Sequence, residues 1–307
     1  MAVKRPPLTP GSDGDPLDDV RVRLERIESA LEKLKRTDQL VQALARRLYL
    51  DGVDLPPRKQ LRSHRFGVMS QNGEDGLLLE LFRRIGVERR RFVEIGCGVN
   101  GGNSGFLAQE LGWSGLMVDG NPGAVSKVEL KFASEDIKAE CHFVSPETIN
   151  EIIETAGLAG EIDLLSIDID GNDFWVWDAT TVTNPRVVII EYNHLLGRTA
   201  AVTIPYNPEF RLKNAPTRAY RGASLEAMVR LGRRKGYRLV SSERINAVFL
   251  RDDIDSDLPT LETREAYQAP ANSGRDVYKK IGDHGLTLVS VNEDGTLAEP
   301  VPAEQVR

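Results

Sequence analysis

The feature that most constrains this chain is a regular alternation of short β-type runs with helical stretches over residues 91–192. The runs are RFVEI (91–95), GLMVD (115–119), CHFV (141–144), DLLSIDI (163–169) and RVVIIEY (186–192). Strands that alternate with helices imply right-handed βαβ crossovers and a largely parallel sheet with helices on both faces. The sequence therefore predicts an α/β fold with a doubly wound sheet.

The end of this region departs from the alternation. A helical stretch from Ser224 to Lys235 leads into YRLV (237–240), and NAVFLR (246–251) follows after a tight connection. The connection is too short for a helical crossover, so these two strands are predicted to pair as an antiparallel hairpin at one side of the sheet. The prediction is then a sheet of seven strands that ends in a hairpin.

The flanking segments have different compositions from this core. The predicted divisions are a disordered tail (1–19), a helix (20–50), a linker (51–67), the core domain (68–252) and a C-terminal extension (253–307). The tail is rich in Pro, Gly and Asp, so it lacks the apolar groups that would offset the entropy of ordering. Pro56 and Pro57 end the helical pattern, and LTLVSV (286–291) is the one strand candidate of the extension.

A heptad pattern marks the N-terminal helical segment. Val20, Leu24, Ile27, Leu31 and Leu34 follow a 4-3-4-3 spacing between charged residues. This pattern is typical of a coiled-coil seam, which predicts a homo-oligomer joined through residues 20–48. The alternative is a helix that packs its apolar stripe on its own domain.

Charge and hydropathy exclude several classes of partner. The 307 residues carry 40 Lys and Arg against 46 Asp and Glu, and the net charge of -6 argues against a nucleic-acid binder. No apolar run approaches the roughly 20 residues that span a bilayer, and the first residues lack the apolar core of a signal peptide. Two cysteines provide no disulfide framework. The expected location is the cytoplasm.

The most informative stretch is FVEIGCGVNGGNS (92–104). Gly96, Gly98 and Gly101 match the spacing GxGxxG, and glycines after a strand let the backbone approach a ligand closely. Glu94 at the end of the strand would repel a pyrophosphate and attract an ammonium or sulfonium group. Asp119 closes the next strand, where it could accept hydrogen bonds from both hydroxyls of a ribose.

These residues resemble a known family. Glu94-Ile-Gly-Cys-Gly resembles the first motif of the class I S-adenosylmethionine-dependent methyltransferases, which have a Rossmann-like seven-stranded sheet, and Asp119 resembles their ribose-binding acid. More narrowly, six segments look like the FkbM-type and related sugar O-methyltransferases. They are SQNGEDGLLLELF (70–82), FVEIGCGVNGGNS, GWSGLMVDGNP, DLLSIDIDGNDFWVW (163–177), PRVVIIEYN and GASLEAMVRLGRRKGYRLV.

The resemblance covers residues 68–252 and implies a function. It implies S-adenosylmethionine as the cofactor, held by Glu94, Gly96, Gly98 and Asp119. Gly120 and Asn121 would lie beside the ribose and the adenine. The implied activity is methyl transfer to a hydroxyl of a sugar, a glycan or a glycosylated metabolite.

Acidic residues gather where two further strands end. Asp168 and Asp170 lie on one side of the fourth strand by alternation, and Glu191 ends the fifth. One interpretation is a site for Mg²⁺ built from Asp168, Asp170 and Glu191, because carboxylate oxygens suit this hard cation. The other is that Asp168 contacts the amino acid portion of the cofactor while Asp170 and Asp173 cap a turn and a helix.

Other candidates follow from position. Asp170 and His194 are the candidate catalytic bases, because each follows a strand at the ligand edge and His194 titrates near neutrality. Gln71 and Glu74 precede the first core helix, where they would either cover the cofactor or cap the helix. The long loop 198–223, with Tyr206, Tyr220 and Arg221, would contact the acceptor or an anionic group on it.

Two other functions fit parts of the sequence. A NAD-dependent dehydrogenase is supported by the glycine spacing alone and opposed by Glu94 and the terminal hairpin. A methyltransferase-like module without catalysis would serve assembly through the helix 20–48, and Glu94 and Asp119 argue against that loss.

Overall fold

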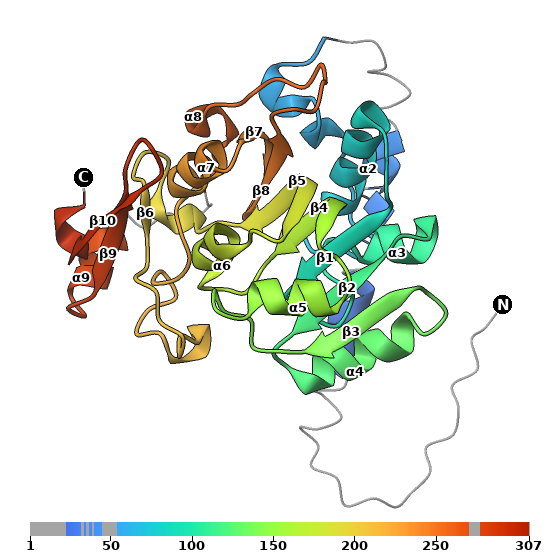
Figure 1. Cartoon of the computed structure of the whole chain (residues 1–307), viewed down its shortest axis with the longest axis horizontal. Helices are drawn as coiled ribbons and strands as arrows, with labels where there is room; N and C mark the ends of the chain where they lie inside the picture. Colours follow the sequence, from blue (N-terminus) through green and yellow to red (C-terminus); the bar gives the residue numbers. More distant parts are fainter. Residues whose placement is uncertain are drawn as a thin grey trace, which may run out of the picture.

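The computed structural model describes residues 23–31, 34, 37–38, 40–44, 54–269 and 277–306. The tail predicted at 1–19 lies outside the described residues. A large sheet with helices on both faces forms the centre of the molecule, and a small sheet lies at one side of it (Figure 1). Within the described residues, no helix is long and apolar enough to cross a membrane.

The large sheet has the predicted architecture. Its strands are β1 (Arg91–Ile95), β2 (Ser114–Asp119), β3 (Ile137–Cys141), β4 (Gly160–Ile167), β5 (Thr183–Glu191), β7 (Tyr237–Glu243) and β8 (Asn246–Arg251). The spatial order is β3-β2-β1-β4-β5-β8-β7, with the first five strands parallel and β8 antiparallel to both of its neighbours. The doubly wound, Rossmann-like sheet and its closing hairpin are therefore confirmed.

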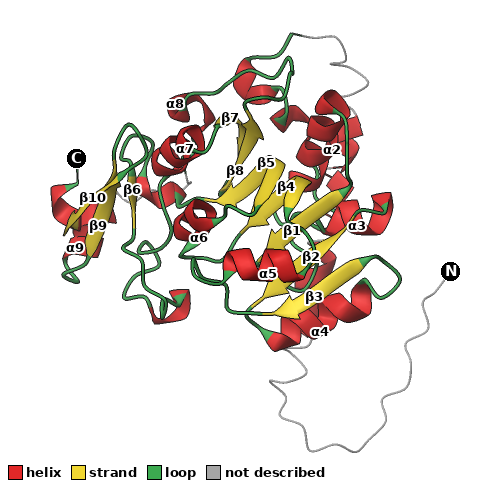
Figure 2. Ribbon diagram, in the orientation of Figure 1, coloured by secondary structure: helices red, strands yellow, loops and turns green. Residues whose placement is uncertain are grey.

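Alternation along the strands divides the core into two layers. The helices are α2 (Glu74–Ile85), α3 (Gly105–Leu111), α4 (Pro122–Lys131), α5 (Ile149–Thr155), α6 (Asp173–Ala179) and α7 (Leu225–Arg234) (Figure 2). Val93 and Ile95 of β1 pack with α5, α6 and α7, whereas Phe92 packs on the opposite face with α2, α3 and α4. Because both faces are buried, these strands are apolar almost throughout.

Strand β3 begins earlier than the sequence predicted. CHFV (141–144) was the expected run, but pairing with β2 ends where Asp119 lies opposite Cys141. The backbone register with β2, and not local hydrophobicity, therefore sets the end of β3. His142 and Phe143 continue past the sheet, and the Phe143 side chain is exposed.

The segments before the core lie partly on it. The described residues of 23–44 are helical. Leu24, Ile27, Leu31 and Leu34 are between 54% and 66% exposed, whereas Leu40 and Leu44 line a small cavity with residues of α2. The described part of the linker, 54–67, forms 3-10 turns at Pro57–Lys59 and Arg62–His64. Leu61 is buried there, so this part is a strap on the core.

The C-terminal extension contributes to a second sheet. Strand β9 (Thr287–Val291) confirms the predicted strand, and it pairs with β10 (Leu297–Pro302) and with β6 (Val202–Thr203) from the loop after β5. The short helices α8 (Thr263–Ala266) and α9 (Val277–Gly282) complete the extension. Leu196, Ile204, Ile281 and Leu288 are buried together, so the extension supports the long loop 198–223.

This packing predicts the effect of shortening Leu288. Leu288→Ala should lower the free energy of unfolding by about 2 to 5 kcal/mol, because Leu288 is fully buried in the cluster of the small sheet. The matched control, Leu130→Ala on α4, should change it by less than about 0.5 kcal/mol, because Leu130 is 81% exposed. Urea unfolding measures both, and equal losses would contradict the packing described.

Candidate functional site

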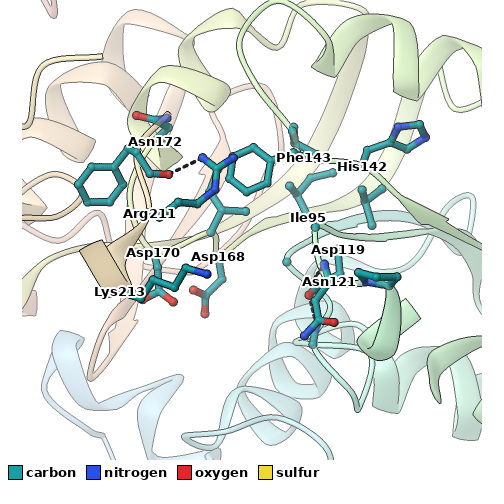
Figure 3. Close-up of a pocket in the computed structure, with 18 of the residues that line it drawn as sticks. Ile95, Asp119, Asn121, His142, Phe143, Asp168, Asp170, Asn172, Arg211 and Lys213 are labelled. Carbon is teal, nitrogen blue, oxygen red and sulfur yellow. Dashed lines mark hydrogen bonds between the residues drawn. The ribbon is translucent and has the colours of Figure 1, made fainter. Parts of the chain in front are cut away.

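A cavity of about 820 Å³ lies at the carboxyl ends of the parallel strands (Figure 3). It opens where the strand order reverses between β1 and β4, which is the place where open α/β sheets bind ligands. The predicted site residues that line it are Gln71, Gly96, Gly98, Asp119, Gly120, Asn121, Asp168 and Asp170. Distant parts of the sequence thus meet at one edge.

The glycine-rich loop requires glycine for two different reasons. Gly96 has a φ of 89°, and a Cβ there would collide with the carbonyl oxygen of Asp168. Gly98 has a φ of 54°, but no atom of the described residues lies within 4 Å of a Cβ placed there. Gly96 therefore lets β1 and β4 approach each other, and Gly98 leaves room on the side of the cavity.

Glu94 holds this loop from below and does not line the cavity. Its carboxylate is fully buried and accepts hydrogen bonds from the backbone N–H of Asn103 (3.1 Å) and of Ser104 (3.0 Å). The hydroxyls of Ser104 (2.6 Å) and Ser166 (2.9 Å) donate to it as well. The loop itself surrounds this carboxylate, and the direct cofactor contact implied by the resemblance stays a prediction.

Burial also changes the proton affinity of Glu94. It raises the pKa of the carboxyl to about 7, although the hydrogen bonds from Ser104, Ser166 and Asn103 act in the opposite direction. The carboxyl thus titrates near neutrality in a position that solvent does not reach.

Asp119 is placed as the sequence predicted. It ends β2 and lines the cavity, where one oxygen accepts the N–H of Gly98 (2.9 Å) and the other the N–H of Asn121 (2.8 Å). Asn121 caps α4 by accepting the N–H of Gly123 (2.9 Å). Each carboxylate oxygen of Asp119 retains capacity for a further hydrogen bond, so the side chain can receive donors from a ligand.

Of the two residues expected to cover the cofactor, only Gln71 lines the cavity. Asp75 shapes the segment that carries it by accepting the N–H groups of Val68 (2.6 Å) and Met69 (2.8 Å). Glu74 is buried and accepts hydrogen bonds from the N–H of Asn72 (2.9 Å) and from Asn246 (2.8 Å). Glu74 therefore holds the start of α2 and lies away from the cavity.

The acidic group at the edge differs from the predicted metal set. Ligand atoms of Asp168, Asp173 and Glu191 lie within 4.8 Å of one another. Asp170 is not part of this group, because its left-handed backbone (φ 58°) presents its carboxylate to Arg221 at 2.9 Å. Asp173 also accepts the N–H groups of Ile169 and Gly171 (2.8 Å each) at the start of α6. It therefore stabilises the turn before α6, as the sequence suggested, but it does not cap the helix, whose N-cap residue is Asn172 and which has no side-chain cap hydrogen bond.

Burial raises the pKa values of these carboxyl groups. For Asp168, burial followed by the charges of Asp173 and Asp170 raises the pKa well above its ordinary value. Burial and Asp168 raise the pKa of Glu191 in the same way, although Arg221 acts against this from 3.4 Å. The pKa of Asp173 rises to about 6 by burial. Burial and mutual repulsion thus act in the same direction on this group, and the guanidinium of Arg221 opposes them.

His194 does not reach the cavity. It begins a 3-10 turn (His194–Leu196) after β5, and the described residues that line the cavity do not include it. The chain turns away there because the N–H of Asn193 donates to the carbonyl of Ala223 (2.7 Å). Burial and the nearby Arg221 and Arg244 lower the pKa of His194.

The loop 198–223 reaches the cavity through residues that the sequence analysis missed. Tyr206 instead donates to Glu147 (2.6 Å), and Tyr220 packs edge-on against Phe210 at 6.4 Å between ring centroids. The polar and aromatic lining residues not predicted are His142, Phe143, Asn172, Phe210, Arg211 and Lys213. His142 and Phe143 follow a strand end, which was an available signal, but no local pattern marks Arg211 or Lys213.

Comparisons with known proteins add little. No protein-family model and no curated protein matches the sequence. A solved S-adenosylmethionine-dependent methyltransferase from Clostridium acetobutylicum ATCC 824 is similar at 12% identity and a TM-score of 0.38, over 68% of this chain and 97% of that one. The CurJ carbon methyltransferase is similar at 10% identity and a TM-score of 0.38, over 78% of this chain and 71% of its own. The strand order, and not these likenesses, establishes the fold.

The two glycines predict separable effects. Gly96→Ala should lower the free energy of unfolding by about 3 kcal/mol, because it combines a left-handed backbone with a collision against Asp168. Gly98→Ala should cost about 1 kcal/mol and still weaken S-adenosylhomocysteine binding, because its methyl group projects toward the cavity. Urea unfolding and calorimetry test this, and unaltered ligand affinity in Gly98→Ala would count against the site.

Proposed function

We propose that this chain is a S-adenosylmethionine-dependent O-methyltransferase that acts on a hydroxyl of a sugar, a glycan or a glycosylated metabolite. The observation that carries the proposal is that Glu94 accepts the backbone N–H groups of the glycine-rich loop. A dinucleotide-binding loop leaves the N–H groups at its helix free for a pyrophosphate. Here the N–H groups of Asn103 and Ser104, which lead into α3, already donate to an internal carboxylate.

This interaction argues against the dehydrogenase. A pyrophosphate at α3 would have to displace Glu94, which is fully buried and hydrogen bonded. A cofactor without phosphate has no such conflict. Asp119 next to Gly98 still supplies a ribose site, so a nucleoside with a cationic substituent suits the cavity better than a dinucleotide.

The remaining lining residues suit the parts of S-adenosylmethionine. Asp119 would accept the ribose hydroxyls, Gly96 and Gly98 would let the cofactor approach the backbone, and Asn121 with Gly120 would lie beside the adenine. Asp168 and Gln71 would hold the amino acid portion, whose ammonium group favours an ionised Asp168. When bound, the cofactor supplies a methyl group on a sulfonium sulfur.

Transfer to oxygen then depends on positioning. An in-line displacement requires the acceptor hydroxyl to face the methyl group, and a nearby base eases loss of its proton. Of the two bases predicted, Asp170 lines the cavity and is oriented by Arg221, whereas His194 lies outside the lining. We therefore assign the role of base to Asp170.

Self-association through the helix 20–48 remains part of the proposal. The exposed side chains of Leu24, Ile27 and Leu31 support it, because an exposed heptad seam is stabilised by a partner helix. An assembly module without catalysis would use the same helix, and cofactor binding distinguishes it from an enzyme.

Calorimetry separates these functions. Wild-type protein should bind S-adenosylhomocysteine with micromolar affinity, and Asp119→Ala should weaken this binding at least about tenfold, because hydrogen bonds to a charged acceptor are lost. Glu110→Ala on α3 is a matched control that lies outside the cavity. If the protein binds NAD but not S-adenosylhomocysteine, the proposed methyltransferase activity is wrong. If it binds neither compound, the assembly module without catalysis is favoured.

Mg²⁺ is a second cofactor that the acidic group would suit. Asp168, Asp173 and Glu191 offer three oxygen ligands within the reach of one ion, although Arg221 already places a positive charge beside Glu191. A bound ion would stabilise the folded protein. Millimolar Mg²⁺ should therefore raise the unfolding temperature of wild type and of Asp170→Asn, but not of Asp168→Asn. An unchanged temperature in wild type would exclude the metal.

A further inference from the structure

One wall of the cavity, formed by the loop 198–223, is basic. Phe210 and Arg211 line it just before the 3-10 turn Leu212–Asn214, and Lys213 lines it from within that turn. The small C-terminal sheet packs against the same loop, so this wall is supported by the fold.

The Arg211 side chain is oriented by an aromatic ring and carbonyl groups, and among the described residues no carboxylate pairs with it. Its guanidinium carbon lies 3.2 Å from the centre of the Phe143 ring, and one of its nitrogens donates to the carbonyl oxygens of Phe210 (2.7 Å) and Pro208 (3.3 Å) (Figure 3). An aromatic face and carbonyl groups orient a guanidinium but do not neutralise its charge. The remaining N–H donors of Arg211 are therefore available to a ligand.

Lys213 is the second cation among the residues that line the cavity. Within the part of the chain that the structure describes, neither Lys213 nor Arg211 has an acidic partner at ion-pair distance. Arg221, the other basic residue near the cavity, pairs with Asp170 and Glu191. Two cations without acids on one wall favour an anionic ligand, since a carboxylate or phosphate would make charge-assisted hydrogen bonds with both.

Asn172 adds a second requirement. This residue is 95% buried and lines the cavity, and its amide N–H donates to the carbonyl of Asn207 (2.9 Å). Its side-chain oxygen has no partner among the described residues. A buried acceptor is costly unless a donor reaches it, and a hydroxyl of the ligand would supply one. The Phe210 ring, packed on Gly171, offers an apolar face beside it.

Resting on the proposed function, we infer that the methyl acceptor is an acidic, hydroxylated molecule: a sugar whose phosphate or carboxylate group binds Arg211 and Lys213. One of its hydroxyls donates to the side-chain oxygen of Asn172. Asp119 would face the cofactor, and Arg211 and Lys213 would face the anionic group of the acceptor.

The test compares three probes on protein saturated with S-adenosylhomocysteine: glucose, glucose 6-phosphate and glucuronate. Ligand-observed NMR titration should show that at least one anionic probe binds about tenfold more tightly than glucose, and the preferred anion separates phosphate from carboxylate. Arg211→Gln and Lys213→Gln should each weaken that probe by about tenfold. Arg218→Gln, an exposed change in the same loop outside the cavity, should leave it within about twofold.

The affinity for S-adenosylhomocysteine keeps this inference distinct from the proposed function. In both Arg211→Gln and Lys213→Gln, this affinity should stay within about twofold of wild type. If all three probes bind equally well, or none binds, the proposal of an acidic acceptor is wrong while the proposed methyltransferase activity stands. Anion binding that survives both substitutions would also contradict the acidic acceptor. If the wild type does not bind S-adenosylhomocysteine, both proposals are wrong.

Discussion

The structure depends on one buried carboxylate at the end of the first strand. Glu94 accepts the N–H groups that open α3 and the hydroxyls of Ser104 and Ser166, so it joins β1, β4 and the glycine-rich loop. It holds the loop beside the cavity and occupies N–H groups that such a loop otherwise offers to a phosphate. The conformation of the loop thus rests on these hydrogen bonds.

The residues that line the cavity follow from the topology. Parallel strands end at one edge and bring Asp119, Asp168 and Glu191 together, where burial raises the pKa values of Asp168 and Glu191. The basic wall comes from a loop that enters the second sheet through β6, and the C-terminal extension holds it there. A segment without motifs of its own therefore supports the part of the site that would face the acceptor.

Much of the fold was predictable because its signals are local. Apolar runs, a helix cap such as Ser224, and the short connection between β7 and β8 each specify an element without reference to the rest. The end of β3 was missed because pairing with β2 decides it. Of the second sheet only the strand β9 was predicted, since a two-residue strand such as β6 has no detectable periodicity.

By itself, the sequence determined the doubly wound sheet, the glycines at 96 and 98 and the acid at 119, because strand ends and tight turns are encoded by neighbouring residues. Only the tertiary structure decided which acids and bases meet. Asp173, and not Asp170, joins the acidic group, because the left-handed backbone at Asp170 turns its carboxylate elsewhere. The turn after Asn193 keeps His194 out of the cavity lining. Arg211 and Lys213 line the cavity although no local pattern predicts it, because long-range packing decides which side chains meet there.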